Sequence, residues 1–229
     1  LLQIAPHAVP RHIELCIIDR LGQTKEVLMN LTLIPGTQST VASIIDISER
    51  KRAEEQLKFL SHHDQLTGLY NRTFLNQEIQ RLKRKNITGI IVCDVDGLKM
   101  VNDTMGHKAG DELLKAVARL LRDSFRQGDT VARIGGDEFL IIMPESDQAA
   151  VEDAGRRIRQ AVAEYNRQNQ GVPLMLSIGF AVSNEQRNTF TDLFKEADRR
   201  MYEEKLHHRE EIHKKMQEAL GKLNQPKEI

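Results

Sequence analysis

Four acids in this sequence stand beside apolar runs, at positions where carboxylates can do chemistry. In "RIGGDEFLIIM", Asp137 and Glu138 follow two glycines and precede an apolar run. In "GIIVCDVD", Asp94 and Asp96 come at the end of another apolar run. Side chains alternate along a strand, so Asp94 and Asp96 are expected to share one face. If the two runs form neighbouring strands, three or four carboxylates converge at one edge of a sheet.

The two glycines before Asp137 predict the local geometry. Gly135-Gly136 lies between "TVARI" and "FLIIM", and such a pair is typical of a two-residue hairpin turn in which both positions have positive φ. This prediction places Asp137 and Glu138 at the start of the return strand, where carboxylates reach water.

Converged carboxylates repel one another and need a positive partner. The partner is either a basic side chain or a divalent cation. An all-oxygen ligand set favours Mg²⁺, which takes one or two carboxylates and leaves its other positions to water and substrate phosphates. The alternative interpretation is that these acids are ordinary turn residues in solvent. Because each acid pair adjoins an apolar strand, the combined pattern favours a metal–phosphate site.

The segment between the acid pairs carries Asn102 and Asp111. Asn102 offers donors and an acceptor, whereas ionised Asp111 only accepts, so the pair is suited to reading a purine edge such as that of guanine. Alternatively, Asp111 belongs to a helix N-cap region and Asn102 to a turn. Further along, Lys205 and Arg209 are expected either to neutralise phosphate or to form a solvated helix face.

The composition limits the class of protein. The chain has 229 residues, of which 40% are hydrophobic and 29% charged, the profile of a globular protein. Lys+Arg and Asp+Glu both number 33, and this balance argues against bulk electrostatic binding of nucleic acid or anionic lipid. No apolar run approaches the roughly 20 residues that cross a membrane. Cys16 and Cys93 have neither CxxC spacing nor a disulfide framework, so we expect reduced thiols in a cytoplasmic protein, or in the cytoplasmic part of a longer, membrane-attached one.

Hydrophobic patterning predicts two regions of different character. Residues 12–47 indicate three short strands, which alone would leave a sheet face uncovered. From residue 64, helices alternate with buried strands and one hairpin, which predicts an α/β (α+β) fold with a mixed central sheet flanked by helices. The expected helices cover about 71–85, 110–126 and 147–168 and begin again near 191; the expected strands are 89–96, 130–134, 139–143 and 174–182.

Residues 46–63 are dense in helix formers and predict a helical connector. Ala53, Leu57 and Leu60 form a narrow apolar seam at 4-3 spacing. Such a seam suits a helix that pairs with a copy of itself. A linker helix that packs one side on its own domain is the other interpretation.

Four motifs in order resemble those of the GGDEF family of diguanylate cyclases. They are "DQLTGLYNR" at 64–72, "DVDGLKMVNDTMGHKAGD" at 94–111, the name-giving "GGDEF" at 135–139 and "ADRRMYEEK" at 197–205. The resemblance covers roughly 63–209, and four collinear motifs are far more specific than one.

The resemblance implies a cyclase-like palm fold that joins two GTP molecules into cyclic di-GMP and releases two pyrophosphates. It also implies a homodimer, because each domain holds one GTP. The resemblance implies that Asp94, Asp137 and the Val95 carbonyl bind Mg²⁺, or Mn²⁺ as an alternative metal, and that Glu138 supports the metal or deprotonates the hydroxyl. It implies phosphate contacts from the backbone of Gly97 and Leu98 and from the side chains of Lys205 and Arg209. It also implies that Asn102 and Asp111 recognise guanine. At Leu98 the chain departs from the commonest family pattern, which has an aromatic residue there.

A second motif, "RQGD", resembles the RxxD product-inhibition site of the same family. The resemblance implies that Arg126 and Asp129 contact bound cyclic di-GMP, with Arg157 as a further contact. The alternative is an ordinary ion pair at the end of a helix.

The N-terminal strands end in "IIDISERKRAEEQL", which resembles the close of a PAS sensor domain. The expected organisation is a partial PAS-like antiparallel sheet at 1–47, a linker helix at 48–62, the GGDEF domain at 63–209 and a charged extension at 210–229.

Active diguanylate cyclase is the leading hypothesis. The rivals are a catalytically silent GGDEF domain that acts as a receptor for GTP or cyclic di-GMP, and a dimerising module with a scaffold domain. A nucleic-acid polymerase would share the paired acids, but the neutral charge argues against it.

Overall fold

The computed structural model describes residues 11–82, 89–169, 171–184 and 189–223 of the chain. The chain divides into two compact units, Leu1–Leu60 and Ser61–Ile229, and each is described by itself.

The first unit contains three antiparallel strands, as the patterning predicted. They are β1 (Arg11–Ile18), β2 (Thr24–Leu33) and β3 (Thr40–Asp46), in the order β1-β2-β3. Every residue of β3 is exposed, including Ile44 and Ile45. The uncovered sheet agrees with the expectation from three strands alone, while the PAS resemblance stays a prediction.

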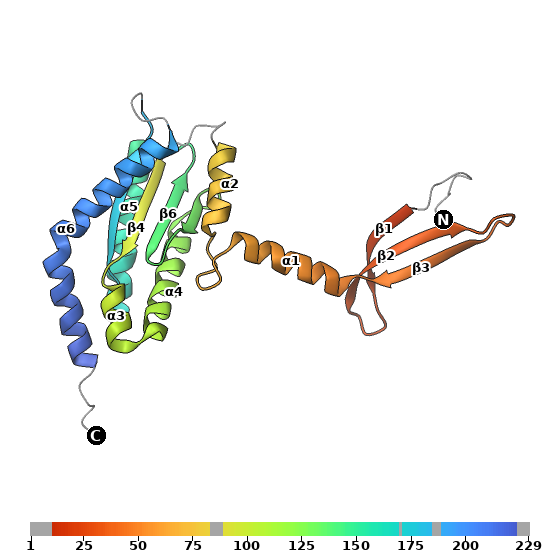
Figure 1. Ribbon diagram of the computed structural model, residues 1–229, viewed down its shortest axis with the longest axis horizontal. Helices are drawn as coiled ribbons and strands as arrows, with labels where there is room; N and C mark the ends of the chain where they lie inside the picture. The colour runs from red at the N-terminus through yellow and green to blue at the C-terminus, as the bar shows by residue number, and fades with distance from the viewer. Residues whose placement is uncertain (1–10, 83–88, 170, 185–188, 224–229) are drawn as a thin grey trace, which may run out of the picture. The chain divides into compact units, whose positions relative to one another are not determined.

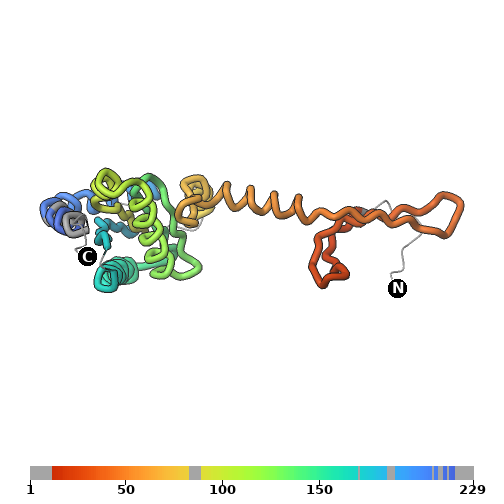
Figure 2. The backbone as a smooth tube through the Cα atoms, turned by 90° about the horizontal axis from the view of Figure 1, so that it is seen from below, coloured from red at the N-terminus to blue at the C-terminus, as the bar shows by residue number. Residues whose placement is uncertain are grey.

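Helix α1 (Ser48–His62) follows β3 and is drawn as an unbroken coil in Figure 2. Asp46 precedes it and accepts a hydrogen bond from the Ser48 backbone N–H at 2.9 Å. Leu57 and Leu60 of the predicted seam are exposed, at 67% and 39%. The seam is therefore open for contact with another helix.

The second unit is built on a four-stranded sheet of order β5-β6-β4-β7, in which β4 and β6 lie side by side (Figure 1). Its strands are β4 (Gly89–Val95), β5 (Thr130–Arg133), β6 (Glu138–Met143) and β7 (Leu176–Val182). Its helices are α2 (Arg72–Leu82), α3 (Leu98–Met105), α4 (His107–Ser124), α5 (Gln148–Gln168) and α6 (Phe190–Leu223). The α+β class is confirmed. All strand pairings in the described sheet are antiparallel, and a parallel element occurs as the isolated bridge between Tyr70 and Ala132.

Alternation along β4 divides the hydrophobic core into two layers. Ile91, Cys93 and Val95 pack with residues of α4 and α5. Ile90 and Val92 face the other way and pack with residues of α2 and α6. The pattern explains why β4 is buried throughout and apolar except for Asp94, since helices cover both of its faces.

Helix α3 was not predicted, and α4 begins earlier than the predicted position 110. Both boundaries are glycines with positive φ, Gly97 at 75° and Gly106 at 83°. Glycine adopts this conformation at little cost, so two helices of different direction fit into a short stretch of sequence.

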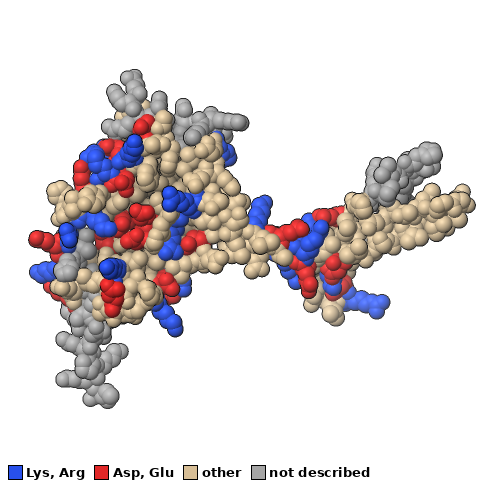
Figure 3. Space-filling model, in the orientation of Figure 1, with Lys and Arg blue, Asp and Glu red and all other residues tan. Residues whose placement is uncertain are grey.

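The surface carries both charges in mixture. Figure 3 shows acidic and basic side chains interspersed over the visible face of the second unit, in keeping with the balanced composition. Among the described helices, none combines the length and apolar character needed to cross a bilayer.

Candidate active site

The ends of β4 and β6 bring the two acid pairs together, as the sequence predicted. Asp94 is the cross-strand partner of Glu138. One step further, the Val95 backbone N–H donates to the Asp137 carbonyl at 2.9 Å. Side chains directly opposite on paired strands lie on one face, so the Asp94 and Glu138 carboxylates share a face of the sheet.

The turn before these acids differs from the predicted two-residue turn. Neither Gly135 nor Gly136 has positive φ. The Ile134 N–H donates to the Glu138 carbonyl at 2.9 Å, so the connection includes Asp137, and the strand starts at Glu138. A Cβ on Gly135 would lie 2.7 Å from Glu138 Oε2. Gly135 therefore lies against the end of the Glu138 side chain, and its backbone conformation does not require glycine.

Asp94 is paired with Lys205 of α6, whose Nζ lies 2.6 Å from Asp94 Oδ1. Burial raises the pKa of Asp94, the Lys205 hydrogen bond and charge oppose that effect, and the charge of Asp137 adds to it. Burial also opposes the charge on Lys205, but the Asp94 hydrogen bond and the nearby acids outweigh it and raise the pKa of Lys205. The sequence predicted a phosphate contact for Lys205, whereas in the structure the Lys205 ammonium contacts Asp94.

Asp96 has a hydrogen-bond partner of its own, Ser177 of β7. Ser177 Oγ lies 3.0 Å and 2.9 Å from the two Asp96 carboxylate oxygens. Burial raises the pKa of Asp96 to about 6, although the Ser177 hydrogen bond lowers it. Asp96 is therefore a buried acid bound by Ser177, and the lone serine in the apolar strand "LSIGFAV" was the available sequence signal for this partner.

Glu138 lies in an acidic environment. Burial raises its pKa first, followed by the charges of Asp137, Asp94 and Asp198, while Arg72 lowers it. A carboxylate with a raised pKa is a better proton acceptor near neutral pH.

The residues fit a magnesium ion that retains water and phosphate ligands. Among the described residues, no three His, Cys, Asp or Glu side chains gather closely enough to hold a metal ion by themselves. The predicted ligand set has only two carboxylates, Asp94 and Asp137, and the Val95 carbonyl, which is the number that Mg²⁺ usually takes from a protein. The contact between Lys205 and Asp94 shows that this position attracts a cation.

The predicted base-recognition residues lie on the two helices after β4. Leu98 starts α3 with its side chain in the core, so an aliphatic residue fits where the family pattern has an aromatic one. Asn102 in α3 and Asp111 in α4 are both half-buried. Their helices pack together, and the Asn102 amide lies against Gly110, the residue before Asp111.

The predicted phosphate contact Arg209 lies one turn beyond Lys205 on α6 and is exposed. The described contacts do not bring Arg209 to the acids.

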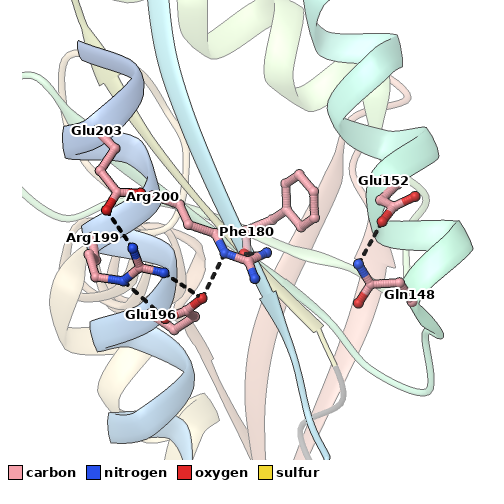
Figure 4. A network of polar contacts seen from close by, with 7 residues as sticks. All are labelled: Gln148, Glu152, Phe180, Glu196, Arg199, Arg200 and Glu203. Atoms are coloured by element: carbon pink, nitrogen blue, oxygen red, sulfur yellow. Dashed lines mark hydrogen bonds and ion pairs between the residues drawn. The ribbon is translucent and has the colours of Figure 1, made fainter. Parts of the chain in front are cut away.

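Arg200 of α6, the helix that carries Lys205, contacts both β7 and its own helix (Figure 4). Arg200 donates to the Phe180 carbonyl at 3.1 Å and to Glu196 at 2.7 Å. Its guanidinium carbon also lies 5.6 Å from the centroid of the Phe180 ring.

Arg133, like Arg200, was not singled out from the sequence. It donates to Asp64 at 3.0 Å and to the Gly136 carbonyl at 2.7 Å. The guanidinium therefore joins the "DQLTG" segment to the residue before Asp137. An arginine two residues before the first glycine of the turn was the available signal.

The three predicted product-inhibition residues line one cavity of about 590 Å³ between α4, β6 and α5. Arg126 Nε lies 3.3 Å from Asp129 Oδ1. Arg157 pairs with Asp153 at 2.6 Å. The structure thus brings Arg126, Asp129 and Arg157 together, each guanidinium already close to an acid.

Carboxylates at the ends of two neighbouring strands, with a lysine beside them, form an arrangement that can bind a divalent cation together with phosphate. Residues 61–211 match the family described as diguanylate cyclase, GGDEF domain, and the chain belongs to this family.

Individual relatives carry different activities. The chain is 35% identical over 178 residues to diguanylate cyclase DgcM of Escherichia coli, covering 75% of this chain and 43% of DgcM. It is 34% identical over 166 residues to cyclic di-GMP phosphodiesterase PdeR of Escherichia coli, covering 71% of this chain and 25% of PdeR. The chain thus spans less than half the length of these relatives.

Among solved structures, the chain resembles the coiled coil and GGDEF domain of DgcB from Caulobacter crescentus, determined in complex with c-di-GMP. The TM-score is 0.62 at 26% identity, with 69% of this chain and 88% of that chain covered.

Proposed function

We propose that this protein is a diguanylate cyclase that condenses two GTP molecules into cyclic di-GMP and releases two pyrophosphates. The observation that carries the proposal is the pairing of Asp94 with Glu138, beside Asp137, at one sheet edge in a chain of the GGDEF family. Degenerate sites would lack these acids, and here all three are present.

In the proposed site, Asp94, Asp137 and the Val95 carbonyl hold Mg²⁺, or Mn²⁺. When bound, the metal neutralises the phosphates and lowers the pKa of the attacking hydroxyl. Glu138 accepts the proton of the 3′-hydroxyl, a role that suits its raised pKa. The backbone at Gly97 and Leu98 positions phosphate oxygens at the start of α3.

Two further groups bind substrate in this proposal. Asn102 and Asp111 receive the guanine, since an amide and a carboxylate complement its edge. Lys205, which lies on Asp94 here, would bind a phosphate of the substrate, and Arg209 would supply a further positive charge on the same helix.

Catalysis requires two copies, because each 3′-oxygen must attack the α-phosphate of the GTP held by the other copy. A two-fold arrangement provides this geometry. The exposed Leu57 and Leu60 of α1 support pairing through that helix. The N-terminal unit, which we propose to be the end of a PAS sensor, would then control the pairing.

Product feedback is the second part of the proposal. Arg126 and Arg157 line a cavity large enough for a nucleotide, and a guanidinium can bind phosphate or guanine through two parallel hydrogen bonds. The same cavity favours the alternative function, a receptor for cyclic di-GMP that performs no synthesis.

The decisive experiment is chromatography of the products formed from GTP and Mg²⁺ at several protein concentrations. We expect cyclic di-GMP and pyrophosphate, with a specific activity that rises with concentration as copies pair. Asp137→Asn should lose the activity, whereas Glu164→Gln, a half-buried acid near the end of α5, should retain it.

Folded wild-type protein that makes no dinucleotide yet binds cyclic di-GMP would establish the receptor function instead. Normal turnover in Asp137→Asn would refute the metal assignment.

A further inference from the structure

Helix α4 carries a glycine in its interior where helix propensity favours almost any other residue. Gly110 is the fourth residue of α4, it is buried, and its φ is negative, so backbone conformation does not require glycine. Glycine lowers helix stability relative to alanine. The local cost indicates that something approaches the backbone at this point.

The group that approaches is the side chain of Asn102. A Cβ built on Gly110 would lie 2.0 Å from Asn102 Oδ1 and 2.9 Å from Asn102 Cγ. It would also lie 3.2 Å from Leu98 Cδ1, a contact that a small shift of the leucine relieves. Because the asparagine side chain is short, its whole amide would have to rotate away.

We propose that Gly110 is a positioning residue that sets the base selectivity of the site by holding the Asn102 amide beside Asp111. The inference rests on the proposed function, in which Asn102 and Asp111 recognise guanine. A methyl group at 110 would turn the amide out of line with Asp111 and remove its contact with the base. The triphosphate contacts, which lie at the sheet edge and on α6, would persist.

The test measures nucleotide selectivity and not activity alone. Affinities for the α,β-methylene analogues of GTP, ITP and ATP are compared at equilibrium, so that no turnover occurs. ITP lacks the 2-amino group of guanine, and ATP presents a different edge. For Gly110→Ala we expect the preference for GTP over ATP to fall about tenfold, with ATP affinity changed less than about twofold.

The matched control is Gly155→Ala. Gly155 is likewise a buried glycine inside a helix, α5, but a Cβ there meets only ordinary contacts, at 3.5 Å from Arg159 and 4.0 Å from Phe180. This variant should keep the wild-type preference. Because Gly110 acts through Asn102, adding Gly110→Ala to Asn102→Ala should produce no further loss of preference.

The outcomes separate the two claims. If the wild type prefers GTP and Gly110→Ala keeps that preference, or weakens GTP and ATP equally, the inference is wrong and the proposed function stands. If the wild type has no preference for GTP, the proposed function fails and the inference falls with it.

Folding is followed by melting temperature. Should Gly110→Ala fail to fold, the double variant Asn102→Ala/Gly110→Ala should recover the stability of Asn102→Ala, because the clash is removed. A double variant as unstable as Gly110→Ala would overturn the inference.

Discussion

Two aspartate–lysine pairs, one in each unit, occupy similar positions at strand ends and behave in opposite ways. Asp46 ends β3 and lies 3.0 Å from Lys25; Asp94 lies near the end of β4, 2.6 Å from Lys205. Hydrogen bonds from the Ser48 backbone and side chain, then from Lys25, lower the pKa of Asp46. Burial raises the pKa of Asp94 in spite of Lys205.

Burial explains the difference. The Asp46 side chain is 48% exposed and that of Asp94 only 9%. An aspartate exposed to water ionises at little cost in free energy, and Asp46 caps a helix in this state. Burying an ionised aspartate removes it from water at a cost in free energy that the rest of the fold must offset. A strained charge of this kind in a site is a functional candidate, because a ligand cation can relieve it.

A third pair, Asp64 with Arg133, lies between these extremes at 26% exposure. Burial acts to raise the pKa of Asp64, but hydrogen bonds from Thr67 and Arg133 outweigh it, and the pKa is lowered. Among these three pairs, the pKa of the aspartate is raised only in the most buried one.

The largest expected effect comes from the two strand-end acids themselves. Asp94→Asn should reduce pyrophosphate release from GTP at least about 100-fold, because a metal ligand is lost. Asp46→Asn keeps an oxygen that accepts from Ser48 and should change turnover less than about twofold. Turnover assays with melting curves check both variants, and equal effects would show that the comparison has no functional meaning.

The lysines provide the next test. Lys205→Met should lower kcat/KM for GTP about 10- to 100-fold, since the phosphate loses a preorganised positive charge. Lys25→Met, its counterpart in the exposed pair, should leave kcat/KM unchanged. Steady-state kinetics with GTP measure both values. A wild-type kcat/KM in Lys205→Met would contradict this prediction.

Arg126 tests whether an exposed ion pair outside the sheet edge has a function. Its side chain is 66% exposed although Asp129 beside it is nearly buried. Arg126→Ala should raise the inhibition constant for cyclic di-GMP about tenfold, because a bidentate contact is lost. Arg156→Ala removes a neighbouring exposed arginine that does not line the cavity and should leave inhibition as it is. Titration of the initial rate with cyclic di-GMP gives both constants.

The smallest effect concerns stability. Asp64→Asn should lower the free energy of unfolding by about 1–3 kcal/mol at pH 7, or roughly 3–10 °C in melting temperature. Since the folded-state pKa is below the ordinary value of 3.8, ionised Asp64 stabilises the fold above that pH, and its contribution is lost as pH falls further.

The difference between Asp64→Asn and wild type should therefore shrink below about pH 4. Melting curves at several pH values check this, with the exposed Asp123→Asn as control. A difference that stays constant with pH would contradict the role of the ionised form.

The hydrophobic periodicity and the turn residues predicted much of the secondary structure. The apolar runs predicted β4 and β6 within one or two residues, and their acids were correctly expected at a shared edge. Helix α3 was missed because it is short and bounded by glycines, which in sequence indicate loops. The Gly135-Gly136 turn was misjudged because a pair of glycines between two strands does not by itself require positive φ.

The amino-acid sequence by itself determined where the acids stand and which strands carry them, because alternation and turn residues act between near neighbours in the chain. Only the tertiary structure decided which cation each acid contacts, that Ser177 bonds to Asp96, and that the Asn102 amide lies against Gly110. These contacts depend on which distant segments meet and on how completely each charge is removed from water. The spacing of residues along the chain determines neither of them.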